Sequence, residues 1–482
     1  MWALLAACAA SAGAAPVTME LTLPWGGAVR PGQPAEVAIR LDSPSLAALE
    51  LELTAPGVLT RVPFDVQADT PGVLHLPLVM NGSGPLRARA STAAGVVAEA
   101  MLVPRPVTPV QSVVAAAIGG APPDLMPPDA LWRPVGAAGM PRTQHGYGPV
   151  SVLLIGAATL AALDLRQASA LEGYLAGCGR AVMVGLPHAA VAALRDGAGC
   201  AGAALWAGAL RDAPALLRAA LRAPPPAALP AGDVLDTLHA VDAHGANARD
   251  AVLLFLAAYA VLALLALLRA PRVVVMLPVL AALLALLVWH GAAPDLRLLA
   301  WSEQTAPGSA RVVGRLQVLG AGTGLAALPL PDGVLALALP PGAWQESDAG
   351  MHGAGAARLR IRAHLLSRTS VDLVGTLTVR PALSLTLVAA GVQVRNPGPD
   401  SSPAAVLVWR SRALSVPALA PGARWTPGAD TAAASGAAAD LAVRRTRPDA
   451  AALLVRADAL DLPGLEQRGW LLLRPQPTAR KE

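Results

Sequence analysis

Residues whose types could support catalysis are few and widely spaced in this chain of 482 residues. His145, Asp164 and His188 are the side chains that would have to converge in a hydrolase or amidase. A general base, its orienting carboxylate and a nucleophile must lie within hydrogen-bond reach of one another. The turn after Val184, where a strand-to-helix elbow would hold that nucleophile, reads Gly185-Leu-Pro-His188 and contains no serine or cysteine. The sequence therefore assigns no catalytic residue.

Two cysteines, Cys178 and Cys200, could form a disulfide, because an even pair is typical of one in an exported domain. Two small apolar side chains that never meet are the alternative, since the sequence does not give their Cα separation. The pair has neither the CxxC spacing of a redox site nor further ligands for zinc. The third cysteine, Cys8, ends the run Leu5-Ala6-Ala7-Cys8, which fits the lipobox of bacterial lipoproteins and could carry a lipid anchor.

A glycine-rich run and a polar segment could bind a cofactor or a metal. Gly197-Ala-Gly-Cys-Ala-Gly202 is a literal GxGxxG, but a dinucleotide site needs a strand before it, and a helix is expected there. Asp236, His239 and Asp242 would lie at i, i+3 and i+6 on a helix, with His244 nearby. That face could hold a metal, although a polar collar that solvates the chain is the favoured interpretation. We therefore predict neither a cofactor nor a metal.

Three arginines, Arg358, Arg360 and Arg362, alternate with apolar residues, so on a strand their guanidinium groups share one side. Such a side could hold an anionic polymer or a lipid headgroup. A solvated edge that resists aggregation is the alternative. The net charge of +5 is small for this length, and no block of basic residues resembles a nucleic-acid-binding stripe, so nucleic acid is not a predicted partner.

The elements that must position these residues are arranged around two uncharged apolar runs, 251–268 and 273–289. At about 1.5 Å of rise per residue, each is just long enough to cross a hydrocarbon core. The connector 269–272 carries Arg269 and Arg272, and the positive-inside rule places it in the cytoplasm. The sequence thus predicts a two-helix transmembrane hairpin in a bacterial inner membrane, with the lipid bilayer as a partner and the large domains in the periplasm.

The region before the hairpin is predicted to begin with a secreted domain. Residues 1–15 resemble an export signal peptide. Alternating runs such as Leu49–Leu53 predict half-buried strands, and together they predict an immunoglobulin-like β-sandwich over 16–106. The dipeptide Asn81-Gly82 indicates a hairpin that joins the apolar strands on either side of it.

A doubly wound α/β domain is predicted over 107–228. Unbroken apolar runs at 110–118 and 150–155 fit strands that are buried on both faces of a parallel sheet. Asp164 is placed to cap the helix that follows, and Gln167 three residues later can complete a capping box. Strands and helices then alternate, which is the order of an α/β domain.

A juxtamembrane segment, 229–250, leads into the hairpin, and a β-rich periplasmic region, 290–482, follows it. Period-two patterns return in this last region and predict an all-β domain. A helix is expected over 450–460. The loop 396–403 and the Ala, Gly and Ser-rich stretch 430–440 are expected to be mobile.

The order of these parts resembles bacterial membrane proteins that carry a periplasmic, glutamine amidotransferase-like α/β domain. The most similar stretches are Val150–Leu186 and Gly391–Gly422. Active amidotransferases use a Cys-His-Glu set with the cysteine at the elbow, and this chain has Gly185-Leu186-Pro187 there. The resemblance therefore implies a degenerate domain, in which the fold is retained without its chemistry.

The fold class expected is multidomain, with an N-terminal β-sandwich, a doubly wound α/β domain, a transmembrane hairpin and a C-terminal all-β domain. The function expected is that of a non-enzymatic inner-membrane protein whose periplasmic domains scaffold or sense a cell-envelope partner, itself a protein. An envelope hydrolase or amidase of amidotransferase-like fold is the alternative. A pocket that gathers two or more of His145, Asp164 and His188 within hydrogen-bond reach would favour that enzyme.

Overall fold

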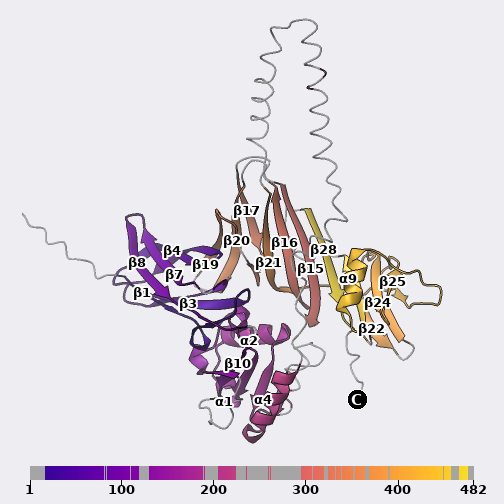
Figure 1. Cartoon of the computed structure of the whole chain (residues 1–482), viewed down its shortest axis with the longest axis horizontal. Helices are drawn as coiled ribbons and strands as arrows, with labels where there is room; N and C mark the ends of the chain where they lie inside the picture. Colours follow the sequence, from indigo (N-terminus) through magenta and orange to yellow (C-terminus); the bar gives the residue numbers. More distant parts are fainter. Residues whose placement is uncertain are drawn as a thin grey trace, which may run out of the picture.

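A computed structural model provides the structure of the chain (Figure 1). It describes residues 17–80, 82, 84–108, 110–118, 130–187, 189, 191, 205–223, 235, 259, 261, 295–306, 308–319, 324–331, 333–337, 339–350, 353–363, 368–388, 391–448, 450–456 and 466–475.

Strands make up 52% of the described structure, whereas helices make up 17%. The described residues contain four α-helices: α1 (Ala157–Ala161), α2 (Leu165–Ala176), α4 (Ala213–Arg222) and α9 (Ala437–Arg445). The predicted class with substantial α and β parts is therefore wrong, and the molecule is mostly β. Forty-five glycines and 45 prolines explain part of this balance, because both residues interrupt helices.

The N-terminal strands form two sheets that pack face to face. One sheet has the order β1-β3-β6, and the other includes the run β5-β4-β7-β8. Their bounds are β1 Thr18–Thr22, β3 Pro34–Asp42, β4 Ala47–Ala55, β5 Val58–Val66, β6 Gly72–Val79, β7 Leu86–Thr92 and β8 Gly95–Leu102. On β4, Leu49, Leu51 and Leu53 alternate with glutamates and point into the shared core. The hairpin predicted at Asn81-Gly82 is wrong, because β6 pairs with β3 and β7 pairs with β4.

Strands from the C-terminal region extend the second of these sheets. The full order is β17-β20-β19-β5-β4-β7-β8, with β17 at Gly324–Leu330, β19 at Ala343–Gly350 and β20 at Gly353–Ala363. The joint is a parallel pairing of Gln345 and Glu346 on β19 with Thr60 and Arg61 on β5. Two regions far apart in sequence thus share one sheet, which Figure 1 shows as β19 and β20 lying beside β4 and β7.

An eight-stranded sheet forms the C-terminal part, in the order β18-β21-β16-β15-β28-β27-β24-β25. The bounds are β15 Asp295–Ala306, β16 Ser309–Leu319, β18 Val334–Ala336, β21 Arg368–Thr378, β24 Ala405–Trp409, β25 Arg412–Val416, β27 Ala451–Arg456 and β28 Glu466–Leu473. A three-stranded sheet, β22 (Ser384–Val388), β23 (Gly391–Arg395) and β26 (Arg424–Trp425), shares its core. α9 packs on the opposite face, where Leu441 and Ala442 meet Leu299, Trp301 and Leu454.

A parallel five-stranded sheet, β11-β10-β12-β13-β14, lies between these regions in sequence. Its strands are β10 Ser112–Ala117, β11 Ala130–Pro134, β12 Val152–Gly156, β13 Ala181–Val184 and β14 Leu205–Gly208. Leu171 and Leu175 of α2 cover one face, and Ala213, Leu217 and Ala220 of α4 cover the other. Strands such as β13 are buried on both sides, which explains their continuous apolar sequences.

The prediction of a doubly wound domain is nevertheless wrong as made, because such a fold places a helix in the crossovers between its parallel strands. The described connection from β11 to β12 contains only the short 3-10 helices η3 (Ala137–Gly139) and η4 (Gln144–Tyr147). This connection contacts the N-terminal strands instead, because η4 packs against β3.

The membrane assignments also require correction. Within the described ranges, no helix combines the length and the apolar character needed to cross a membrane. The predicted two-span topology and the inner-membrane location are therefore not supported. The predicted spans, apart from Tyr259 and Val261, lie outside the described residues, as do Arg269 and Arg272.

One local prediction in the C-terminal region is also wrong. The helix expected over 450–460 is strand β27, and the stretch 430–440, expected to be mobile, ends in the first residues of α9. A central strand buried on both faces, as β27 is, has the same apolar run as a buried helix, so periodicity does not separate the two.

Candidate functional site

The predicted catalytic candidates do not assemble into a site in the described part of the chain. Asp164 caps α2: its carboxylate accepts from the Gln167 backbone N–H at 2.8 Å, and the Gln167 side chain accepts from the Asp164 backbone N–H at 3.1 Å. This confirms the predicted capping box. The same carboxylate also pairs with Arg142 at 3.1 Å. Asp164 is thus used in holding the helix, and His188 lies outside the described residues.

His145 lies in η4 at the contact with the N-terminal strands, with only 8% of its surface exposed. Burial lowers the pKa of His145 to about 4, although the nearby Glu36 carboxylate opposes that shift. The ring is therefore neutral at ordinary pH. Its Nε2 atom has no hydrogen-bond partner in the structure.

Glu36 on β3 is the centre of the contact between the N-terminal strands and the parallel sheet. Its buried carboxylate accepts hydrogen bonds from the backbone N–H of Arg142 at 3.1 Å and of Thr143 at 2.6 Å. His75 Nδ1 lies 2.8 Å from the same carboxylate. Burial alone would raise the pKa of Glu36, but these hydrogen bonds outweigh it and keep the pKa below its usual value. The cluster therefore fastens the N-terminal strands to the segment before β12.

An aromatic stack lies beside this junction. Trp25, Tyr147 and Tyr174 follow one another with ring centroids 5.7 and 4.7 Å apart, and Trp25 Nε1 donates to the Gly146 carbonyl oxygen at 2.7 Å. Tyr174 also hydrogen-bonds the backbone of Arg180 beyond the end of α2. The stack therefore packs the N-terminal strands, η4 and α2 together.

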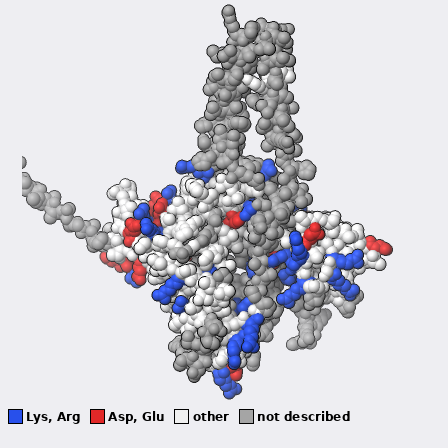
Figure 2. Space-filling view, viewed as in Figure 1, with Lys and Arg blue, Asp and Glu red and all other residues white. Residues whose placement is uncertain are grey.

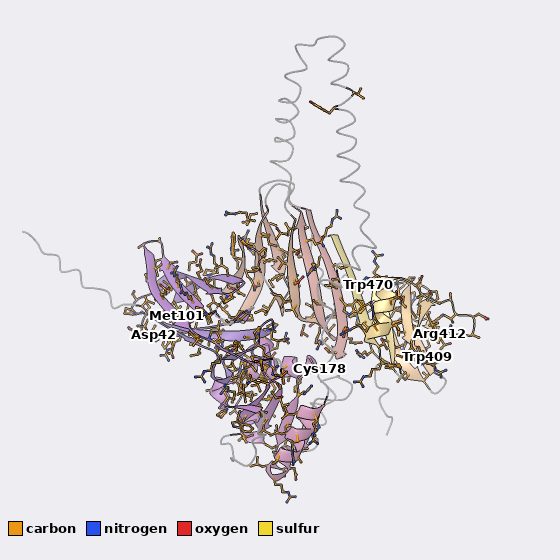
Figure 3. The ribbon with its side chains drawn as sticks, viewed as in Figure 1. Asp42, Met101, Cys178, Trp409, Arg412 and Trp470 are labelled. Carbon is orange, nitrogen blue, oxygen red and sulfur yellow. The ribbon has the colours of Figure 1, made fainter. Side chains whose placement is uncertain are left out.

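Cys178 forms the turn that ends α2 (Figure 3). It adopts a left-handed conformation with φ of 68°, its N–H donates to the Leu175 carbonyl, and the Gly179 N–H donates to the Tyr174 carbonyl. These two bonds form a Schellman motif. Cys178 is disulfide-bonded. Cys200 and Cys8, together with the glycine run 197–202, lie outside the described residues, so the predicted pairing with Cys200 stays a prediction.

In the polar segment that could have held a metal ion, the structure describes one residue only. Asp236, His239, Asp242 and His244 lie outside the described residues, whereas the neighbouring Leu235 is fully buried against α9 and the eight-stranded sheet. Within the described ranges, no group of three or more His, Cys, Asp or Glu side chains could hold a metal ion.

The three arginines of β20 do not lie on a sheet edge, as one interpretation required, because β20 pairs with both β17 and β19. Arg360 bonds Glu346 at 2.9 Å, and Glu346 accepts from Trp344 Nε1 at 3.2 Å. Arg61 lies over the Trp344 ring at 5.3 Å and pairs with Glu52 at 3.1 Å. Opposite charges thus alternate across the joint between β19 and β5. These pairs stabilise the shared sheet, and they leave Arg360 and Arg61 engaged with carboxylates instead of with an external anion.

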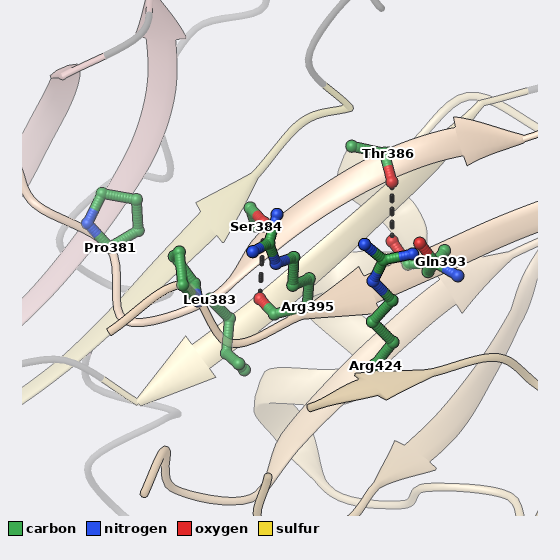
Figure 4. A pocket seen from close by; sticks show the side chains of 8 residues that line it. Pro381, Leu383, Ser384, Thr386, Gln393, Arg395 and Arg424 are labelled. Atoms are coloured by element: carbon green, nitrogen blue, oxygen red, sulfur yellow. Dashed lines mark hydrogen bonds between the residues drawn. The ribbon is translucent and has the colours of Figure 1, made fainter. Parts of the chain in front are cut away.

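A groove on the outer face of the β22-β23-β26 sheet is the candidate binding site, with a volume of about 530 Å³ (Figure 4). We call it the arginine groove and define it by its lining residues, Pro381, Leu383, Ser384, Thr386, Gln393, Arg395, Pro397 and Arg424. Strand register explains this lining. Ser384 pairs with Arg395, Arg395 pairs with Arg424, and Thr386 pairs with Gln393, so these side chains share one face.

The opposite face of the same sheet is apolar. Leu385, Val392 and Val394 alternate with the polar residues of the groove and enter the large C-terminal core. The alternation therefore forces the arginine, hydroxyl and amide side chains outward. Arg395 and Arg424 are both exposed, and within the described residues no hydrogen bond or ion pair joins either guanidinium to the protein.

The backbone that carries the two arginines is held firmly. Asn396 is 1% exposed, and its side chain donates to the carbonyl oxygens of Asp400 at 2.7 Å and Leu419 at 2.9 Å. Its backbone N–H donates to the Ala423 carbonyl, next to Arg424. The loop 396–403 was expected to be mobile, but these bonds tie it to the turn before β26 and fix the separation of the arginines.

Comparisons with known proteins add little to this geometry. No protein-family model matches the chain, and no curated protein matches it. Among solved structures, the CARDB domain of a protein from Pyrococcus furiosus, crystallised in complex with di-metal ions, is 15% identical. The match covers 19% of this chain and 87% of that domain, with a TM-score of 0.15. At that TM-score the likeness carries no argument about this chain.

The groove residues were not among the candidates drawn from the sequence. Arg395 and Arg424 stand far apart along the chain, and only the pairing of β23 with β26 brings them opposite each other. The available signal was the alternation of Ser384 and Thr386 with leucines and of Gln393 and Arg395 with valines. This alternation indicates one polar strand face. It does not indicate that Arg424, from another strand, lies on that face as well.

Proposed function

We propose that this chain is a non-enzymatic binding protein whose β framework presents the arginine groove to an anionic group, carried by a small ligand or by a partner. The observation that carries this proposal is the pair Arg395 and Arg424, directly opposite each other with no acidic side chain among the lining residues. Like charges placed opposite each other on neighbouring strands are destabilising. An anion between them removes that cost and forms charge-assisted hydrogen bonds with both guanidinium groups.

The wider surface supports the same proposal. Figure 2 shows basic side chains gathered over the C-terminal strands, whereas acidic and basic side chains interleave over the N-terminal ones. A positive surface around a groove raises the local concentration of anions and speeds their association. The firm backbone at Asn396 adds preorganisation, which reduces the entropy lost on binding.

The hydrolase alternative receives less support from the described residues. Asp164 is committed to the cap of α2 and to Arg142, and His145 is buried and neutral beside Glu36. No hydrogen bond links these two candidates in the described structure. A general base that is sealed inside a junction cannot reach a substrate.

The test is calorimetric titration of the full chain with inorganic phosphate and with sulfate at low ionic strength. We expect binding that weakens as salt is added, because exposed charges are screened, and that is lost in the double variant Arg395→Gln, Arg424→Gln. The matched control is Arg412→Gln, which removes the same charge from β25, outside the groove. Equal binding by the double variant and the control, or no binding of either anion, would overturn the proposal.

A further inference from the structure

We infer that the arginine groove recognises an acid group carried on a hydroxylated body, as in a sugar phosphate or a sugar acid. This inference rests on the proposed function, since it names the ligand class of the same groove. It is carried by the arrangement of the polar atoms around the two arginines and by the size of the groove.

The groove is larger than a bare anion needs. Its volume of about 530 Å³ falls within the range of roughly 300–1,000 Å³ that is usual for small-molecule sites. Arg395 and Arg424 occupy one part of the lining. The other residues that line it include Ser384, Thr386, Gln393 and the two prolines Pro381 and Pro397. A ligand that fills it has a body beyond its acid group.

The lining has two rows of polar side chains. Strand register places Ser384, Arg395 and Arg424 in one row across three strands, and Thr386 and Gln393 in the next row. Two residues along a strand separate the rows by about 7 Å. That is the span between an acid group and the more distant hydroxyls of a single sugar ring. A sugar acid can therefore engage both rows at once.

The hydroxyls of the groove are prepared to accept hydrogen bonds. Ser384 Oγ donates to the Arg395 carbonyl oxygen and Thr386 Oγ1 donates to the Gln393 carbonyl oxygen, each at 3.4 Å, and Figure 4 marks both bonds. Each hydroxyl proton is thus directed to the backbone, which leaves the oxygen lone pairs for a donor from the ligand. Gln393 adds one amide that can both donate and accept. Acceptors of this kind match ligand hydroxyl groups.

The rest of the lining argues for a sugar rather than a nucleobase. The two prolines offer small apolar surfaces, which suit the C–H face of a sugar ring. No aromatic side chain is among the described residues that line the groove, whereas sites for bases usually stack them on aromatic rings. Both features favour a sugar ring over a nucleobase as the body of the ligand.

The experiment is calorimetric titration of the full chain with four probes: D-glucose 6-phosphate, D-glucuronate, D-glucose and inorganic phosphate. At least one acidic sugar should bind about 10-fold more tightly than inorganic phosphate, and glucose should show no binding. The stronger of the two acidic sugars identifies whether phosphate or carboxylate is preferred. Phosphate binding as tightly as both acidic sugars would refute the ligand class while leaving the proposed function intact, and absence of all binding would refute both.

Variants separate the two rows. Arg424→Gln should weaken inorganic phosphate and the acidic sugar alike, by about 10-fold or more, because it removes charge-assisted bonds. Thr386→Val and Gln393→Leu should weaken only the acidic sugar, by several-fold, and leave phosphate unchanged. Thermal melting of each variant establishes that it is folded, and Arg412→Gln should bind all probes as the unmodified chain does. An acidic sugar that binds Thr386→Val and Gln393→Leu without loss would overturn the inference.

Discussion

Replacing Glu36 with glutamine should destabilise the junction between the N-terminal strands and the parallel sheet. The Glu36 carboxylate is buried and bonds three groups: the backbone N–H of Arg142, the backbone N–H of Thr143 and the ring of His75. Glutamine keeps the shape of the side chain but carries no charge. Its amide N–H₂ group also needs an acceptor, and two of the three partners, the backbone N–H groups, can only donate.

The magnitude follows from these three hydrogen bonds. A bond to a charged acceptor contributes about 1.5–3 kcal/mol, whereas a bond between neutral groups contributes about 0.5–1.5 kcal/mol. Each of the three bonds therefore loses about 1 kcal/mol when the charge is removed, and the free energy of unfolding should fall by about 3 kcal/mol. The carboxylate is only 3% exposed, so solvent does little to screen the loss.

The assay is equilibrium unfolding in urea, followed by tryptophan fluorescence. Trp25 donates to the Gly146 carbonyl beside the cluster, so it is one of the ten tryptophans whose emission can change when this junction unfolds. Glu99→Gln is the matched control, because Glu99 forms an exposed pair with Arg89 at 3.2 Å, and exposed pairs contribute about 0–1 kcal/mol. If Glu36→Gln costs no more than Glu99→Gln, the role assigned to the buried cluster is wrong.

Three further predictions concern the same part of the fold. His145 has a pKa of about 4 in the fold against 6.5 when unfolded, so the unfolded chain binds more protons between these values. The free energy of unfolding should therefore fall by about 3 kcal/mol as the pH drops from about 6.5 to 4. The same dependence of unfolding free energy on pH in the variant His145→Leu would contradict this. Gly179→Ala places a methyl group against the Tyr174 ring and should lower the free energy of unfolding, measured in urea, by about 1–3 kcal/mol. The control is Gly422→Ser at an open turn, which should lose only what the strain of its positive φ costs. Reducing the disulfide at Cys178 should lower the free energy of unfolding by about 2–4 kcal/mol, and a Cys178→Ala variant should then be insensitive to reductant.

Local features of the parallel sheet could be predicted because their signals depend on neighbours in sequence. The capping box of Asp164 and Gln167 spans four residues and forms as expected. The apolar run at 150–155, predicted to be a strand buried on both faces, corresponds to β12, whose first four residues are buried. The capping box lies within one short segment, so its signal does not depend on tertiary contacts, whereas an apolar run is also compatible with a buried helix.

Predictions failed where a distant partner decides the outcome. The Asn81-Gly82 turn has hairpin chemistry, yet the flanking strands β6 and β7 enter different sheets because each has a better partner in β3 and β4. Arg360 was read as part of a free basic face, and Glu346 on β19 neutralises it. The pairing of β19 with β5 joins segments nearly 300 residues apart, at positions such as Thr60 and Gln345, and no pattern within either segment indicates it.

The arginine groove is not evident from the sequence, but its strand pairing distinguishes it from the rest of the sheet surface. Strand pairing normally places opposite charges against each other, as it does for Arg61 and Glu52. At Arg395 and Arg424 the pairing is Arg against Arg, on a backbone fixed by the buried Asn396. A framework that only needed stability would gain from an acidic residue at either position. That neither position is acidic, while the surrounding hydroxyls and amide remain open to solvent, is the reason to test this face for an anionic ligand first.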